Sequence, residues 1–179
     1  MPKSMIKLLS IADFVSLSNA IFGFLAILMI FLEEIHISFS FILISLLADG
    51  LDGIVARKTR KGELGGYMEA MADMISLSIA PSFFVYYTYY DFITKCIYYH
   101  SALIIILIIF LSLSIIRLAS FHIIKEKQFF IGLPASAGTI FIIILSFFKL
   151  EFMYILPFIF IISISMISPL HFPKIGVKI

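Results

Sequence analysis

Long apolar stretches, separated by short polar segments, make up most of the chain. They lie near residues 12–32, 38–57, 64–90, 100–124, 132–149 and 152–170. A helix needs about 20 apolar residues to cross a hydrocarbon core of roughly 30 Å, and each stretch is close to or above that length. The pattern predicts an all-α integral membrane protein with six transmembrane helices, folded as a single domain over residues 1–179.

The composition agrees with a membrane protein. Hydrophobic residues make up 62% of the 179 positions and charged residues 13%, whereas soluble domains average about 25% charged residues. The first apolar stretch is too long for the core of a signal peptide, and we expect it to be retained as a helix. The basic residues are not interleaved with aromatic side chains as nucleic-acid binding would require. The Ile-rich, Lys-biased composition is compatible with an archaeon or an AT-rich bacterium. We therefore expect a multi-pass protein of a prokaryotic plasma membrane that binds no nucleic acid.

Lysine and arginine residues gather on one side of the predicted helices, which sets their orientation because positively charged loops stay in the cytoplasm. They precede the first helix, follow the second, close the fourth and follow the sixth: Lys3, Lys7, Arg57, Lys58, Arg60, Lys61, Arg117, Lys125, Lys127, Lys174 and Lys178. The opposite side holds Lys95 and Lys149. Both termini are therefore expected in the cytoplasm.

Four carboxylates interrupt the second and third apolar stretches, where an ionisable side chain is rarely tolerated without a function. Asp49 and Asp52 precede a short basic turn, and Glu69 and Asp73 follow it. An antiparallel hairpin folded at this turn would bring the two pairs level in a polar cavity that opens to the cytoplasm. Carboxylate oxygens favour hard cations, and no Cys or His falls within the cluster. We predict a site for two hard divalent cations, Mg²⁺ or Mn²⁺, with Ca²⁺ as the alternative that these ligands also allow.

Small residues accompany these acids. Gly53 and Ala56 share a helix face with Asp49, and Gly65 begins the acidic stripe of the next helix, which leaves room for a ligand. Arg57 lies at the expected mouth of the cavity, where a guanidinium can hold a phosphate by paired hydrogen bonds. The combination favours phosphoryl chemistry at a membrane surface, and a charge-paired structural network or an ion path is the alternative.

The spacing of these residues resembles the signature of the CDP-alcohol phosphotransferases, D-x-x-D-G-x-x-A-R followed by G-x-x-x-D-x-x-x-D. The first half is intact at residues 49–57, and the second half, at residues 65–73, carries Glu69 in place of the third aspartate. Counting from Gly66 would put Ala70 and Met74 at the acidic positions, so the Gly65 register is preferred. Segments 13–24, 72–81, 117–121 and 132–138 are also similar to the phosphatidylserine synthase branch of this family.

The resemblance implies a homodimeric transferase that moves a lipid phosphate from CDP-diacylglycerol or CDP-archaeol to the hydroxyl of L-serine and releases CMP. Asp73 is the candidate catalytic base. The candidate metal ligands are Asp49, Asp52, Glu69 and Asp73. Contacts to the nucleotide and diphosphate fall to Asp49, Gly53, Ala56, Arg57 and Gly65, with contacts to the acceptor at Arg117 and Lys125. On the first helix, Ser16 and Asn19 are weaker candidates to approach the nucleotide.

Two other functions stay open at this point. The same chemistry could use glycerol phosphate or inositol phosphate as acceptor, because Arg117, Lys125 and Lys127 could bind the additional phosphate. A protein of a different class, a cation or proton transporter, could use the acidic hairpin as its path. Acceptor competition would test the first alternative, and ion flux into liposomes would test the second.

Overall fold

A computed structural model describes residues 9–58, 64–121, 129–169 and 171–173. The described segments fall into two compact units, Met1–Ala80 and Pro81–Ile179. Each unit is a helical assembly. The expectation of a single domain over the whole chain stays a prediction.

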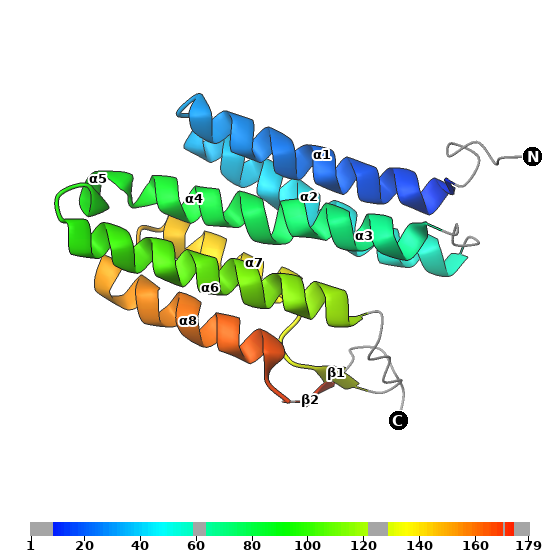
Figure 1. The fold of residues 1–179 in the computed structure, drawn as a ribbon. Helices are drawn as coiled ribbons and strands as arrows, with labels where there is room; N and C mark the ends of the chain where they lie inside the picture. Colours follow the sequence, from blue (N-terminus) through cyan, green and yellow to red (C-terminus); the bar gives the residue numbers. More distant parts are fainter. Residues whose placement is uncertain (1–8, 59–63, 122–128, 170, 174–179) are drawn as a thin grey trace, which may run out of the picture. The chain divides into compact units, whose positions relative to one another are not determined.

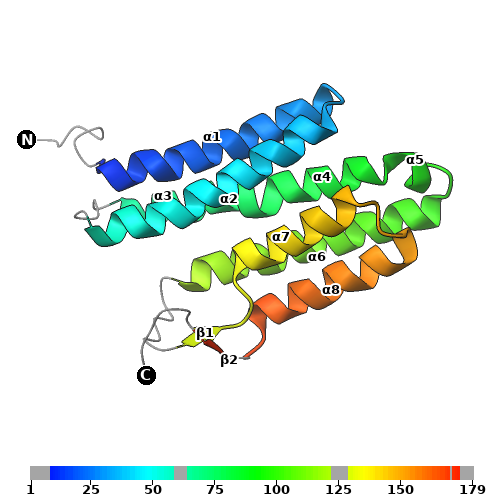
Figure 2. The same cartoon turned by 180° about the vertical axis from the view of Figure 1, so that it is seen from behind.

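The first unit is built around its first helix. Helix α1 (Ile11–Phe31) packs against α2 (Ile35–Lys58), against α3 (Gly65–Asp73) and against the π-helix η2 (Met74–Ile79). Helix α2 also contacts η2. Figures 1 and 2 show α1 lying alongside α2 over most of its length, joined to it by a tight turn. Because α1 touches every other helix of this unit, its polar residues can reach the acidic helix α3.

The second unit is a bundle of apolar helices. Its elements are α4 (Ala80–Thr88), α5 (Tyr90–Ile93), α6 (Ile97–Phe121), β1 (Phe129–Ile131), α7 (Ala135–Phe147), α8 (Phe152–Ile167) and β2 (His171–Pro173). Helix α8 packs against α6 and α7, and α5 packs against α6. The two strands pair antiparallel, with Phe130 opposite Phe172. Figure 1 shows this short pair beyond the end of α8.

One buried apolar cluster holds the second unit together. Its largest fully buried side chains include Phe110 on α6 and Ile155 and Ile159 on α8. Tyr89 closes the cluster at one end, where its hydroxyl donates to the Leu150 carbonyl oxygen at 2.5 Å. Around Gly132, at φ 73°, the chain turns into α7, and the Leu133 amide donates to the Ser165 carbonyl oxygen at 2.9 Å.

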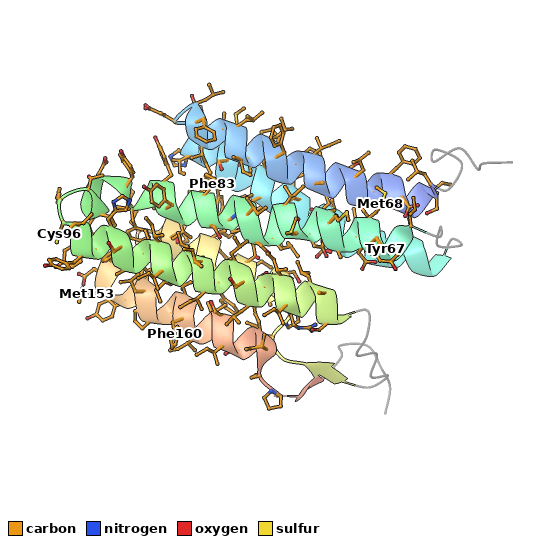
Figure 3. All side chains as sticks on the ribbon, in the orientation of Figure 1. Tyr67, Met68, Phe83, Cys96, Met153 and Phe160 are labelled. Carbon is orange, nitrogen blue, oxygen red and sulfur yellow. The ribbon has the colours of Figure 1, made fainter. Side chains whose placement is uncertain are left out.

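Large apolar side chains also cover the outside of the helices, as expected where the solvent is lipid. Exposed examples are Phe14 on α1, Leu47 on α2 and Ile105 on α6. Figure 3 shows Met153 and Phe160 projecting outward from α8, where their exposed fractions are 65% and 41%. This distribution fits side chains in a hydrocarbon environment, whose contact with lipid carries no penalty.

Within the described part of the chain, three helical stretches are long and apolar enough to cross a membrane: Ile11–Phe31, Gly65–Thr88 and Ile97–Ser120. They correspond to the first, third and fourth predicted spans. The other three predicted spans coincide with two shorter apolar helices, Ala135–Phe147 and Phe152–Ile167, and with α2, whose described apolar part is Ile35–Leu51. The prediction of a helical membrane protein is thereby confirmed, whereas six crossings and cytoplasmic termini stay predictions. The β1–β2 pair is a departure from the predicted all-α fold, and the apolar stretches carried no signal for it.

Candidate active site

The candidate base Asp73 is the last residue of α3 and is buried, with 7% of its surface exposed. Its Oδ1 accepts a hydrogen bond from Nδ2 of Asn19 on α1, at 2.9 Å. Asn19 itself is fully buried. The first unit therefore holds a carboxylate–amide pair in its interior, formed by residues far apart in the sequence.

The other acids of the predicted cluster occupy the helices expected of them. Glu69 lies one turn before Asp73 on α3, so the two carboxylates share a helix face. Asp49 lies on α2, and both Asp49 and Glu69 are half-buried. The backbone of Asp52 belongs to α2, but its side chain lies outside the described residues. That the acidic pair of α2 lies at the same depth as the acidic pair of α3 therefore stays a prediction.

The predicted nucleotide-binding residues are described to different extents. Gly65 is buried at the start of α3. The backbones of Gly53, Ala56 and Arg57 lie in α2, on the helix that carries Asp49, and their side-chain surroundings are outside the described residues. Their helical spacing still places Gly53 and Ala56 on the face of Asp49, because residues four and seven apart stack on one side of a helix.

The two predicted acceptor-binding residues belong to the second unit. Arg117 lies in the last turns of α6 and is half-buried. Lys125 lies outside the described residues. The role of Arg117 and Lys125 as contacts to the acceptor therefore stays a prediction.

The donor set fits a divalent metal by its chemistry. All four predicted ligands are carboxylates, which suit Mg²⁺ and Mn²⁺ better than softer metals. Among the described side chains, no group of three or more His, Cys, Asp or Glu residues is assembled for metal binding. Asp52, which completes the predicted set, is not one of those side chains. The residue types therefore support a metal site, and the arrangement of the ligands around the metal stays a prediction.

A π-helical segment follows Asp73 directly. Within η2 the backbone widens from the α-helical pattern, and the Ala80 amide donates to the Ile75 carbonyl oxygen, five residues earlier. Pro81 comes next in the chain, and a proline ring clashes with the carbonyl oxygen four residues before it in a regular α-helix. A wider turn relieves that clash. The described feature at Pro81 is this change of helix type, and such segments are frequent at functional sites.

The short side chain of Asn19 reaches Asp73 because α1 and η2 approach each other closely. A Cβ atom on Gly23 would lie 2.8 Å from Cα of Ser76, closer than real side chains allow. Gly23 is one turn beyond Asn19 on α1, and Ser76 is one turn beyond Asp73. A glycine at this position therefore permits the contact that brings the amide to the carboxylate.

Residues of α1 that the sequence singled out have separate roles. The buried carboxylate of Asp13 accepts hydrogen bonds from the backbone amide and the hydroxyl of Ser10, at 2.6 and 2.9 Å, and so caps the helix. Ser16 donates to the Ala12 carbonyl oxygen of its own helix at 3.4 Å. Asn19 was expected to approach a nucleotide, and the structure gives it a protein partner that single-sequence reasoning missed.

Comparison with known proteins decides the family. The model of the CDP-alcohol phosphatidyltransferases matches residues 9–168, which include both halves of the acidic signature and all the described helices. The chain belongs to the CDP-alcohol phosphatidyltransferase family. The resemblance inferred from residues 49–57 and 65–73 is thereby confirmed.

Curated relatives of this CDP-alcohol phosphatidyltransferase carry related names. A CDP-diacylglycerol–serine O-phosphatidyltransferase of Methanocaldococcus jannaschii is 34% identical over 176 residues, covering 97% of this chain and 78% of the relative. An archaetidylserine synthase of Methanothermobacter thermautotrophicus is 30% identical over 180 residues, covering 97% and 73%. A CDP-diacylglycerol–serine O-phosphatidyltransferase of Helicobacter pylori is 30% identical over 145 residues, covering 73% and 57%.

Proposed function

We propose that this protein transfers a phosphatidyl or archaetidyl group from a CDP-linked lipid to the hydroxyl of L-serine and releases CMP. The observation that carries the proposal is the similarity to a CDP-diacylglycerol–serine O-phosphatidyltransferase and to an archaetidylserine synthase, at 34% and 30% identity over 97% of the chain. The buried carboxylate Asp73 gives the reaction a candidate base in the first unit.

The proposed step balances as a simple substitution at phosphorus. The serine hydroxyl oxygen forms a bond to the lipid-bearing phosphorus, the bond from that phosphorus to the CMP oxygen breaks, and CMP leaves with the electron pair. Asp73 takes the proton of the serine hydroxyl. A buried carboxylate on a helix is well suited to this task, because its position is fixed by packing rather than by a loop.

The acids would also hold divalent cations. Asp49, Asp52, Glu69 and Asp73 are the proposed ligands of two Mg²⁺ or Mn²⁺ ions, which when bound supply positive charge to the diphosphate and the departing CMP. Arg57 would contact the nucleotide phosphates, with Gly53, Ala56 and Gly65 leaving space beside them. Arg117 and Lys125 are the proposed contacts to the acceptor.

The proposed setting is a prokaryotic plasma membrane crossed six times, with both termini and the active-site cavity on the cytoplasmic side. The charge placement supports this orientation. A homodimer is the proposed assembly, on the family resemblance alone. Lipid tails of the CDP-linked substrate would leave the cavity sideways between helices, because the outer faces of the helices are already apolar.

The test is an acceptor panel with the purified protein in liposomes. CDP-diacylglycerol and CDP-archaeol are each supplied with Mg²⁺ and with serine, glycerol 3-phosphate or inositol phosphate, and both CMP and the mass of the lipid product are measured. Serine is expected to give CMP and an aminophospholipid. CMP formed only with a phosphorylated acceptor would reassign the substrate, and cation or proton flux without CMP would replace the transferase by a transporter.

Glu69 offers a second test of the site. The glutamate occupies an aspartate position of the family signature, and we expect Glu69→Asp to keep turnover within about tenfold of the wild type, since both side chains present a carboxylate and differ by one methylene. The measurement is the rate of CMP release at saturating substrates. Glu69→Gln is the control variant, because it keeps the size of the side chain and removes its charge. A far larger loss in Glu69→Asp would show that Glu69 does not act in place of an aspartate.

A further inference from the structure

The amide of Asn19 and the carboxylate of Asp73 form a buried link between two helices of the first unit. Nδ2 of Asn19 donates to Oδ1 of Asp73 at 2.9 Å, although the residues are 54 positions apart. Resting on the proposed function of Asp73, we propose that Asn19 is a positioning residue, which fixes the carboxylate of Asp73 for proton transfer from the acceptor hydroxyl.

The orientation of the Asn19 amide follows from its partner. An ionised carboxylate can only accept hydrogen bonds, so the NH₂ end of the amide must face Asp73. The Oδ1 atom is then turned away, and it is buried without a hydrogen-bond partner among the described residues. A buried unpaired acceptor is unfavourable. An apolar residue would fill this place without that penalty, so the donor toward Asp73 is the feature that distinguishes asparagine here.

The surrounding backbone keeps the amide in reach. Gly23 allows α1 to approach η2 so closely that a Cβ atom there would lie 2.8 Å from Cα of Ser76. Ser76 is fully buried at this contact. The approach lies one turn from the Asn19–Asp73 bond on both helices, so the hydrogen bond and the helix contact reinforce each other.

A held carboxylate matters more to the transfer step than to substrate binding. The hydrogen bond restricts rotation of the Asp73 carboxylate about χ2, so that an oxygen meets the serine hydroxyl in a fixed geometry. Without the bond the carboxylate would lose one of its restraints while the protein still bound the CDP-linked lipid. The signature of positioning is therefore a loss in kcat with little change in KM for that lipid.

The experiment compares Asn19→Leu with the wild type in CMP release. Leucine is of similar size and cannot donate, and we expect kcat to fall about 10- to 100-fold, the effect of losing one hydrogen bond to a charged group. KM for the CDP-linked lipid should stay within about twofold. Ser18→Ala is the matched control, because the Ser18 hydroxyl bonds to the Phe14 carbonyl oxygen of its own helix. A kcat near the wild-type value in Asn19→Leu, or a change in KM alone, would overturn the proposal.

Two further variants keep the test decisive. Asn19→Ala, a smaller replacement that also lacks a donor, takes the place of the leucine variant if that one fails to fold, and the same loss of kcat is expected. The exchange of partners, N19D with D73N, retains an amide–carboxylate pair but moves the charge to α1; we expect it to fold and to be as inactive as D73N alone. Wild-type activity in the exchanged protein would refute the positioning of Asp73 by Asn19.

Failure of this inference can be told apart from failure of the proposed function. If the wild type releases no CMP with any acceptor, or if Asp73→Asn keeps full turnover, the proposed function or the role of Asp73 is wrong. If Asp73→Asn is inactive while Asn19→Leu and Asn19→Ala are fully active, Asp73 keeps its role and the positioning by Asn19 is wrong.

Discussion

The two units of this protein bury different kinds of side chain. In the first unit the buried residues include the carboxylates Asp13 and Asp73 and the amide Asn19. In the described part of the second unit, the buried polar side chains are hydroxyls: Ser114, Thr139, Ser146 and Ser163. The continuous apolar cluster, from Val85 to Met166, belongs entirely to the second unit.

This difference indicates that the two units have different roles. Buried carboxylates and amides are unfavourable in an apolar environment unless a partner or a function retains them. Asp13 has a partner in the capping interactions of α1, whereas Asp73 lies in the family signature and is bonded to Asn19. The transfer step is therefore expected in the first unit, and the second is expected to contribute stability through its apolar packing, besides the proposed acceptor contacts of Arg117 and Lys125.

The largest expected effect is on turnover and comes from the first unit. Asp73→Asn removes the proposed base while keeping the size of the side chain, and it should lower the rate of CMP release by about 10²- to 10⁴-fold. The matched variant in the second unit is Ser146→Ala, which removes a buried hydroxyl that has no hydrogen-bond partner among the described residues. Its turnover should equal that of the wild type. Equal losses of turnover in both variants would contradict the expected difference in function between the units.

A large effect on stability should come from the second unit. Phe110 is fully buried in the apolar cluster, and Phe110→Ala should lower the free energy of unfolding by about 3 kcal/mol, since the cavity loses packing contacts. Thermal unfolding in detergent measures this change, with the exposed Phe160→Ala as control. Turnover per folded molecule should be kept in both. Loss of turnover without loss of stability in Phe110→Ala would place chemistry in this core.

Substitution of one glycine in each unit tests how tightly the helices of that unit pack, and the expected effects are of intermediate size. In Gly23→Ala the added methyl meets the backbone of Ser76, and overpacking should cost about 1–3 kcal/mol and reduce turnover as α1 moves from Asp73. In Gly138→Ala the methyl meets the flexible end of Met166, which can move aside. Melting temperature and CMP release should both fall further in Gly23→Ala. The reverse order would contradict the tight α1–η2 contact.

The smallest effect is expected at the edge of the second unit. Tyr89→Phe removes the hydrogen bond to the Leu150 carbonyl oxygen and should cost about 1 kcal/mol of stability below pH 10. Burial raises the pKa of Tyr89 to about 12, above its ordinary value near 10. The contribution of the neutral hydroxyl is therefore full below about pH 10 and is lost as the pH rises through about 12. Unfolding curves of the two proteins should converge over that interval; a constant difference would contradict the shift.

Much of the helical architecture could be predicted from hydrophobic pattern. The stretch near residues 64–90 corresponds to the continuous helical segment Gly65–Thr88, and the stretch near 100–124 to α6, Ile97–Phe121. Apolar length predicts such helices because each must satisfy its own backbone in lipid. The π segment η2 and the β1–β2 pair escaped prediction, since neither changes the apolar pattern of the sequence.

The residue types of the site could be predicted from the sequence better than the hydrogen-bond partners of its side chains. Fixed spacing within one helix was enough to put Glu69 and Asp73 on the same face of α3. The bond from Asn19 to Asp73 depends instead on how α1 packs against α3 and η2, which a single sequence does not specify. Gly23 was the available signal, as a small residue one turn from a buried amide, and its meaning emerges from the contact with Ser76.

The dependence of CMP release on divalent metal tests the central claim most directly, because that claim assigns the carboxylates of the first unit to metal-assisted transfer. Purified protein is supplied with a CDP-linked lipid and serine, stripped of metal with a chelator, and titrated with Mg²⁺ or Mn²⁺. The account predicts no CMP in the chelator and a saturable return of CMP release with added metal, absent in Asp73→Asn. Undiminished CMP release in the chelator, or none at any metal concentration, would contradict it.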